Sequence, residues 1–276
     1  MFSGLAIAVL AMSLLSGFKS APLQTIRVSG TGGAIATMRI LGEAFQRSNP
    51  GIRIEILSGM GSSGAVKAVQ AGRLDIGLSG RALTGEERAR GLLVETRYAR
   101  TPFVFGVNTT LKMTTLMLEE VAGIYSGERD WENNKRIRLV LRPLEDSDTP
   151  ILKGMSPAMR EAVDIALRRK GMMMAMTDQE AADAIESVPG AFGGTTLALF
   201  LSEKRAFRVI SLNGVMPSVR TMVDRSYPYS KPFFMITRKT PPAPVRRFVD
   251  FVRSPAGAAI LARNGQAAVR QERPLP

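Results

Sequence analysis

Residues 59 to 83 read GMGSSGAVKAVQAGRLDIGLSGRAL, and they point to one class of fold. The alternating residues Ile52 to Leu57 just before them predict a strand, which runs into the glycine- and serine-rich loop Gly59 to Gly64. A helix is predicted from about Ala65, and Leu74 to Ser79 predicts the next strand. Strand, loop, helix and strand in this order are typical of a unit with two parallel strands.

The same order of elements extends in both directions along the chain. Thr25 to Ser29 predicts an earlier strand, which breaks into a glycine-rich loop before a helix that ends at Arg47. Later strands are predicted at Phe103 to Asn108, Arg138 to Arg142, Phe207 to Leu212 and Phe233 to Arg238, with helices between them. This alternation predicts an α/β fold with a largely parallel sheet. A chain of 276 residues is long enough for two lobes.

The composition excludes several classes of function. The chain has no cysteine and no histidine, which excludes disulfides, thiolate metal sites and Ser-His-Asp or Cys-His catalysis. We therefore expect a protein that is not an enzyme and uses no cofactor or metal. The formal net charge of +13 fits a nucleic-acid or membrane binder, and equally a basic exported protein that attracts anionic solutes. Because the Lys and Arg residues are scattered and aromatic residues make up only 6%, we expect no nucleic-acid partner.

The N-terminus resembles a targeting segment. Leu5 to Leu15 is an apolar run without a charge, as long as a signal-peptide core and short for a membrane span. Ser20 and Ala21 are small residues at a plausible cleavage position, whereas residues 1 to 4 lack the usual positive charge. Residues 1 to 21 are thus expected to be a signal peptide or an N-terminal anchor, with a buried first helix as the alternative. A signal peptide implies an exported, periplasmic protein.

Three loops have the composition of anion cradles. They are SGTGGA at Ser29 to Ala34, GMGSSG at Gly59 to Gly64, and DSDT at Asp146 to Thr149, a few residues beyond Arg142. Such a loop before a helix offers free backbone N–H groups at the positive end of the helix dipole, and Ser or Thr adds a hydroxyl donor. One loop of this kind is weak evidence, but three at the carboxyl ends of strands favour a site for a small tetrahedral anion.

Several segments together resemble a known family. VSGTGGA, followed by the stretch quoted first, is similar to the opening of the phosphate-binding component of bacterial phosphate ABC importers. SVPGAFGGTTLAL (Ser187 to Leu199), PSVRTMVDRSYPYSKPFFMITR (Pro217 to Arg238) and FVDFVRSPAGAAILARNG (Phe248 to Gly265) resemble its later parts. The resemblance implies an extracytoplasmic solute-binding protein that captures phosphate, or a related oxyanion, for a membrane ABC permease. It also implies a monomer.

The resemblance further implies an α/β, periplasmic-binding-protein-like (type II) fold, with two lobes, a ligand cleft and two hinge crossovers. We expect the crossovers near Thr101 to Asn108 and near Ser226 to Pro232. Lobe one would comprise residues 23 to 104 plus 229 to 276, and lobe two residues 105 to 228.

Site residues can be carried over from the resemblance position by position. Ser62 stands where the family uses a serine, and Arg142 matches an arginine whose planar fork can bind two oxyanion oxygens. Ala34 replaces a hydroxyl residue, so only its N–H could serve. The predicted ligand-binding residues are Thr31, Gly33, Ala34, Ser62, Ser63, Arg81, Arg142, Ser147, Asp148 and Thr149.

Two departures from the family pattern concern the ligand. Gly80 stands where the family often has an aspartate that accepts the proton of hydrogen-phosphate. Asp146 and Asp148 flank Ser147 where the family usually has glycines. Asp148 either assumes the role of proton acceptor, or both aspartates point to solvent and cap the following turn. These departures leave open an alternative function, a sensor or assembly protein with the same fold and a degenerate anion cleft.

Overall fold

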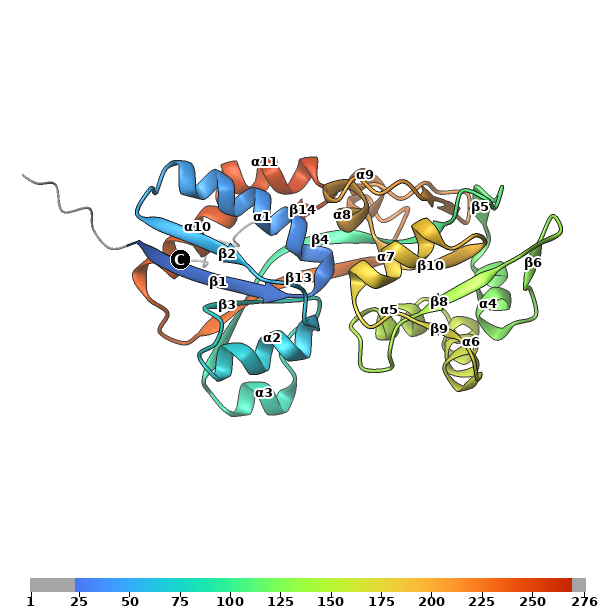
Figure 1. Cartoon of the computed structure of the whole chain (residues 1–276), viewed down its shortest axis with the longest axis horizontal. Coiled ribbons are helices and arrows are strands. Elements are labelled where there is room, and N and C mark those ends of the chain that lie inside the picture. The colour runs from blue at the N-terminus through green and yellow to red at the C-terminus, as the bar shows by residue number, and fades with distance from the viewer. Residues whose placement is uncertain (1–22, 270–276) are drawn as a thin grey trace, which may run out of the picture.

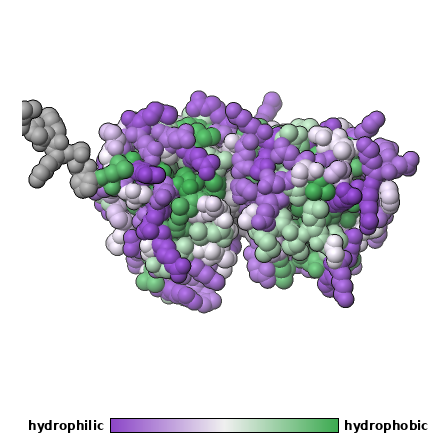
Figure 2. All heavy atoms as spheres, viewed as in Figure 1, coloured by the Kyte–Doolittle hydropathy of each residue, from purple (hydrophilic) through white to green (hydrophobic). Residues whose placement is uncertain are grey.

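The computed structural model describes residues 23–269. The predicted signal peptide or anchor at residues 1 to 21 lies outside these residues. Figure 1 shows two lobes side by side, joined by two long strands that run from one lobe into the other. In the space-filling view the two halves meet at a furrow (Figure 2).

The first lobe is built on a mixed sheet. Strand β1 (Gln24–Gly30) pairs in parallel with β2 (Ile52–Ile56) on one side and with β3 (Ile76–Ser79) on the other. Next to β3 lies β13 (Ser230–Arg238), which is antiparallel to it. At β13 the chain thus returns to the sheet of its first lobe.

Strand β4 (Leu93–Val107) belongs to both lobes. Its first part pairs antiparallel with β13, up to the partners Pro102 and Ser230, and from Phe103 it pairs with β10 (Ala191–Thr196). The predicted strand from Phe103 to Asn108 is therefore only the last part of a longer strand. In the second lobe the sheet continues from β10 to β8 (Arg138–Leu141) and β9 (Met173–Met174), both in parallel register.

The short strands complete the sheets. They are β5 (Thr115–Leu116), β6 (Trp131–Glu132), β7 (Lys135–Arg136), β11 (Arg208–Val209), β12 (Ser211–Leu212) and β14 (Ala267–Ala268). The single strand predicted at Phe207 to Leu212 is divided, because β11 pairs with β4 whereas β12 pairs with β5.

Helices cover both faces of each lobe (Figure 1). In the first lobe α1 (Gly32–Arg47), α10 (Ala243–Val252) and α11 (Pro255–Arg263) lie on one face, and α2 (Gly61–Gln70) and α3 (Gly85–Ala89) on the other. The second lobe carries α4 (Leu118–Ser126), α5 (Asp148–Gly154), α6 (Pro157–Arg168), α7 (Asp178–Ser187), α8 (Leu197–Ser202) and α9 (Val219–Val223). None of the helices within residues 23–269 is long and apolar enough to cross a membrane.

The hydrophobic cores follow the same division. One cluster joins Met38 of α1 and Phe248 of α10 to the sheet of the first lobe. Another joins Phe105 of β4, Phe192 of β10 and the helices of the second lobe. Because β4 changes its partner between Pro102 and Phe103, the cores separate where the two lobes meet. We infer lobe boundaries close to this point and to Ser230; the finer boundaries given by the sequence stay predictions.

Candidate functional site

The first two predicted loops lie at the start of helices in lobe one. Thr31 is the N-cap of α1, and Ser62 lies in the first turn of α2, so both face the positive end of a helix dipole. Gly30 makes this arrangement possible, because its φ is +153° and a Cβ there would lie 1.9 Å from the carbonyl oxygen of Leu78. The close approach of β1 and β3 thus requires glycine where the first loop begins.

Groups from three separate segments meet at Gly80, which follows β3. The N–H of Gly80 donates to Ser62 Oγ at 2.9 Å. A Cβ on Gly80 would lie 2.8 Å from Ser147 Oγ and 2.4 Å from Lys231 Cε. Ser147 is the N-cap of α5 in lobe two, and Lys231 lies on β13. Each lobe therefore contributes one hydroxyl group at this point, and lobe one also contributes a cation.

Lys231 is the centre of a buried ion cluster. Its side chain is 0% exposed, and its Nζ lies 2.5 Å from Asp148 Oδ1 and 3.4 Å from Asp178 Oδ1. Asp178 is the first residue of α7, and its other oxygen accepts a hydrogen bond from Thr31 Oγ1 at 3.3 Å. Gln179 Nε2 adds a second contact between the lobes, to the carbonyl of Gly32 at 3.1 Å. The cluster thus links the two lobes across the cleft.

Arg142 lies beside this cluster, and its Nε has no partner there. Its Nη2 contacts Asp146 Oδ2 at 2.6 Å, and its Nη1 donates to the carbonyl of Ala175 at 2.8 Å. Its Nε is buried and has no hydrogen-bond partner among residues 23–269. A buried N–H without an acceptor costs about 1 to 3 kcal/mol. An anion that supplied the acceptor would remove this cost.

The charges in the cluster do not balance when every carboxylate is ionised. Asp146, Asp148 and Asp178 face the cations Lys231 and Arg142. Burial would raise the pKa of Asp178, but the attraction of Lys231 and Arg142 outweighs it and lowers this pKa to about 2. Burial raises the pKa of Asp148 to about 7, against the attraction of Lys231. With Asp148 protonated the cluster is neutral.

The structure corrects one interpretation of the third loop. Asp148 does not point to solvent; it is buried and bound to Lys231. Asp146 does fulfil a capping role, because its Oδ1 accepts the N–H of Asp148 at 2.9 Å while its Oδ2 holds Arg142. Within residues 23–269 no group of acidic residues is arranged to hold a metal ion.

Gly33, Ala34 and Thr149, also predicted to bind the ligand, are buried, but some of their donors have partners within the chain. The N–H of Ala34 donates to the carbonyl of Thr31 at 3.1 Å. The hydroxyl of Thr149 donates to the carbonyl of Pro143 at 2.8 Å. A Cβ on Gly33 would lie 3.1 Å from Thr196 Oγ1, so α1 packs tightly there against the end of β10.

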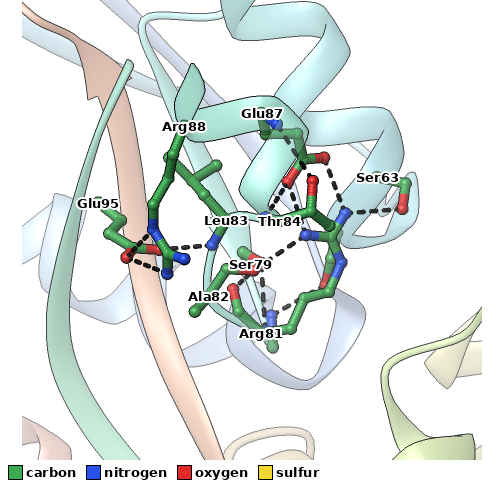
Figure 3. A network of polar contacts seen from close by, with 11 residues as sticks. Ser63, Ser79, Arg81, Ala82, Leu83, Thr84, Glu87, Arg88 and Glu95 are labelled. Atoms are coloured by element: carbon green, nitrogen blue, oxygen red, sulfur yellow. Dashed lines mark hydrogen bonds and ion pairs between the residues drawn. The ribbon is translucent and has the colours of Figure 1, made fainter. Parts of the chain in front are cut away.

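Ser63 and Arg81 belong to a different network, shown in Figure 3. The guanidinium of Arg81 holds Glu87 through two hydrogen bonds of 2.8 and 2.9 Å, and it donates to Ser63 Oγ at 3.0 Å. The hydrogen bond from Arg81 lowers the pKa of Glu87 to about 2. Glu87 also closes the capping box of α3 with Thr84. Arg81 is therefore held by its own lobe rather than by the cluster around Lys231.

Lys231 and Asp178 were missed by the sequence reasoning. The signal for Lys231 was present, because a period of two on β13 places it on the same face as Phe233 and Met235, which are fully buried. A lysine at such a position needs a carboxylate or ligand in the interior. Asp178 carried no comparable signal, since the capping box between Thr177 and Glu180 explains an acidic residue in the first turn of α7.

A cavity of ≈ 340 Å³ lies between the lobes, beside the contact of Gln179 with Gly32. It is lined by Ile35, Arg39, Ser58 and Gly59 from lobe one and by Thr177, Gln179 and Glu203 from lobe two. Both lobes thus border this cavity, and two of its residues, Thr177 and Gln179, flank Asp178 in the sequence.

Two α/β lobes with a polar cleft between them are the architecture of a binding protein. Residues 17–256 match the family model of the PBP superfamily domain, and the chain belongs to this superfamily. The predicted α/β, type II periplasmic-binding-protein-like fold is thereby confirmed.

The solved structures agree on the fold. A putative phosphate ABC transporter substrate-binding protein with bound phosphate from Clostridium perfringens has a TM-score of 0.78 at 21% identity, over 90% of this chain and 100% of that chain. The periplasmic molybdate-binding protein of Azotobacter vinelandii has a TM-score of 0.62 at 13% identity, over 89% of this chain and 100% of that chain.

A sequence relative covers a smaller part of the chain. The phosphate-binding protein PstS 2 of Streptococcus pneumoniae serotype 4 is 32% identical over 111 residues, which are 40% of this chain. The match spans 37% of the length of that relative.

Proposed function

We propose that this protein captures phosphate, or a closely related oxyanion, in the cleft between its lobes. The observation that carries the proposal is the meeting at Gly80 of Ser62 from lobe one, Ser147 from lobe two and Lys231. The unused Nε–H of Arg142 adds a donor beside them. Hydroxyl groups, helix N-termini and two cations together match the oxygens of a tetrahedral anion.

We further propose that the protein works in the periplasm and delivers the anion to a membrane ABC permease. The names of its relatives support this role: the structure from Clostridium perfringens is described as a transporter substrate-binding protein, and the relative from Streptococcus pneumoniae as a phosphate-binding protein. A monomer that closes over one anion and carries out no reaction fits a chain without histidine or cysteine.

One observation favours a second function, a sensor or assembly protein whose cleft binds no free anion. Asp148 and Asp178 already neutralise Lys231 inside the closed cleft. In that case the two carboxylates permanently occupy the position of the anion, and phosphate does not bind.

Isothermal titration with phosphate, after bound ligand has been removed, separates the two functions. We expect one phosphate per chain, and we expect Arg142→Ala to weaken binding by about 10- to 100-fold, because the charge-assisted hydrogen bond from Nε is lost. Arg129→Ala is the matched control, since Arg129 is a half-buried arginine of lobe two that is paired with Glu120 and Glu132. No heat with the folded wild-type chain would favour the second function.

A further inference from the structure

Lys231 occupies a position in β13 where an apolar residue would be expected. Its neighbours on the same face, Phe233 and Met235, are fully buried, and so is Lys231 itself. Placing an ammonium group there is costly unless the group has charged partners in the interior. A methionine or leucine would satisfy the same packing, so the charge itself needs an explanation.

The ammonium group of Lys231 fits beside Gly80 because this residue has no side chain. A Cβ at Gly80 would lie 2.4 Å from Lys231 Cε and 3.3 Å from Lys231 Nζ. Any larger residue would therefore displace the end of the lysine. The Oγ atoms of Ser62 and Ser147, which are the hydroxyls assigned above to the anion, also lie close to Gly80. Lys231 Nζ and these hydroxyls thus approach the same residue, Gly80.

The two carboxylates bound to Lys231 differ in their other contacts. Asp178 also accepts a hydrogen bond from Thr31, so it has a partner in lobe one. Among residues 23–269, Lys231 is the only side chain that donates to the carboxylate of Asp148. Asp148 also gives the shorter contact, 2.5 Å against 3.4 Å for Asp178. Asp148 is therefore the carboxylate whose place at Lys231 an incoming anion would take.

We propose that Lys231 directly contacts the bound anion, and that Asp148 is an internal carboxylate which competes with a doubly charged tetrahedral oxyanion for the ammonium group. The proposal rests on the proposed function and adds a ligand-binding residue to it. A dianion brings two negative charges into a cluster of three carboxyl groups and two cations, which is neutral only when Asp148 is protonated, so the dianion gains most when Asp148 gives up its contact with Lys231. Asp148 thus weakens anion binding, whereas Lys231 strengthens it.

The test compares phosphate binding by isothermal titration in four ligand-free proteins. They are the wild type, Asp148→Asn, the double variant Asp148→Asn/Lys231→Met, and the control Lys239→Met. Lys239 is an exposed lysine just beyond the same strand, so its removal changes the net charge without touching the cleft. In the double variant one carboxyl group and one cation are removed together, and a cooperative thermal transition verifies that it folds.

We expect Asp148→Asn to bind phosphate about tenfold more tightly than the wild type, because the competing charge is gone. The double variant should bind about 10- to 100-fold more weakly than Asp148→Asn, and Lys239→Met should match the wild type. Equal affinity of the double variant and Asp148→Asn would overturn the proposal. Weaker phosphate binding by Asp148→Asn than by the wild type would also overturn the proposal. This comparison is decisive even if the double variant does not fold.

The failure of this proposal is distinguishable from the failure of the proposed function. If the folded wild type gives no phosphate binding at all, the proposed function fails and this inference fails with it. If the wild type binds phosphate and Arg142→Ala does not, the cleft is the site. If phosphate affinity falls in Arg142→Ala but does not change in the variants of Asp148 and Lys231, only the proposal about Lys231 and Asp148 is overturned.

Discussion

Two cations, Lys231 and Arg81, organise two polar regions that differ in nearly every respect. Lys231 is 0% exposed and reaches Asp148 and Asp178 in the other lobe. Arg81 is 26% exposed and holds Glu87, only six residues away in the same lobe. The Arg81 network shapes a surface turn and caps a helix. The ion pairs of the Lys231 cluster join the two lobes, so they form only when the lobes are together. The charges of this cluster therefore act on the closure of the lobes and on a ligand in the cleft.

The largest expected difference between the two regions is in stability. Lys231→Met leaves Asp148 and Asp178 buried without their cation, so the free energy of unfolding should fall by about 3 to 5 kcal/mol. Denaturant unfolding of the ligand-free protein measures it. In the double variant with Asp148→Asn the loss should be smaller than in Lys231→Met alone, because one buried charge is no longer unpaired. An unfolding free energy of Lys231→Met equal to that of the wild type would show that the cluster is already hydrated and open.

The second expected difference is a pH dependence that comes from Asp148. The groups that face it are Lys231 on β13, Asp178 on α7, Asp146 and Arg142 before α5, and Tyr125 on α4. The folded chain keeps the proton on Asp148 up to about pH 7, whereas an unfolded aspartate loses it near pH 4. The folded state therefore binds more protons between these values, and the free energy of unfolding falls as the pH rises through them.

The melting temperature of the ligand-free wild type should be a few degrees lower at pH 8 than at pH 5. The chain has no histidine to obscure this range. Asp148→Asn should remove the difference, and Asp164→Asn, a change of a partly exposed aspartate paired with Lys153, should leave it in place. A wild-type melting temperature that rises from pH 5 to pH 8 would contradict the raised pKa of Asp148.

The smallest effects are expected at Arg81. Arg81→Met breaks a partly exposed pair, which should lower the free energy of unfolding by about 1 kcal/mol or less. Phosphate affinity, measured by titration, should stay within about twofold of the wild type, since the guanidinium is held by Glu87. A loss of binding as large as that of Arg142→Ala would show that Arg81 leaves Glu87 to contact the anion, as the resemblance to the family implies.

The difference between the two regions also explains what the sequence could predict. The alternating strands and helices, and the three loops that precede helices, are local patterns, and the structure has each of them near its predicted place. The pairing of Arg81 with Glu87 is also local. The contacts of Lys231 join residues 53 and 83 positions apart, and no periodicity indicates which distant carboxylate a buried lysine meets. The role of Gly80 was hidden for the same reason, because its lack of a side chain matters to Lys231 and Ser147, which lie far from it in the sequence.

The most direct test of the anion cleft is a crystal structure of the purified chain with phosphate. We expect one phosphate within hydrogen-bond distance of Ser62 Oγ, the guanidinium of Arg142 and Lys231 Nζ, with Asp148 moved away from the ammonium group. A phosphate bound instead at Ser63 and Arg81, or a cleft that stays closed around the contact of Lys231 with Asp148 at saturating phosphate, would contradict this expectation.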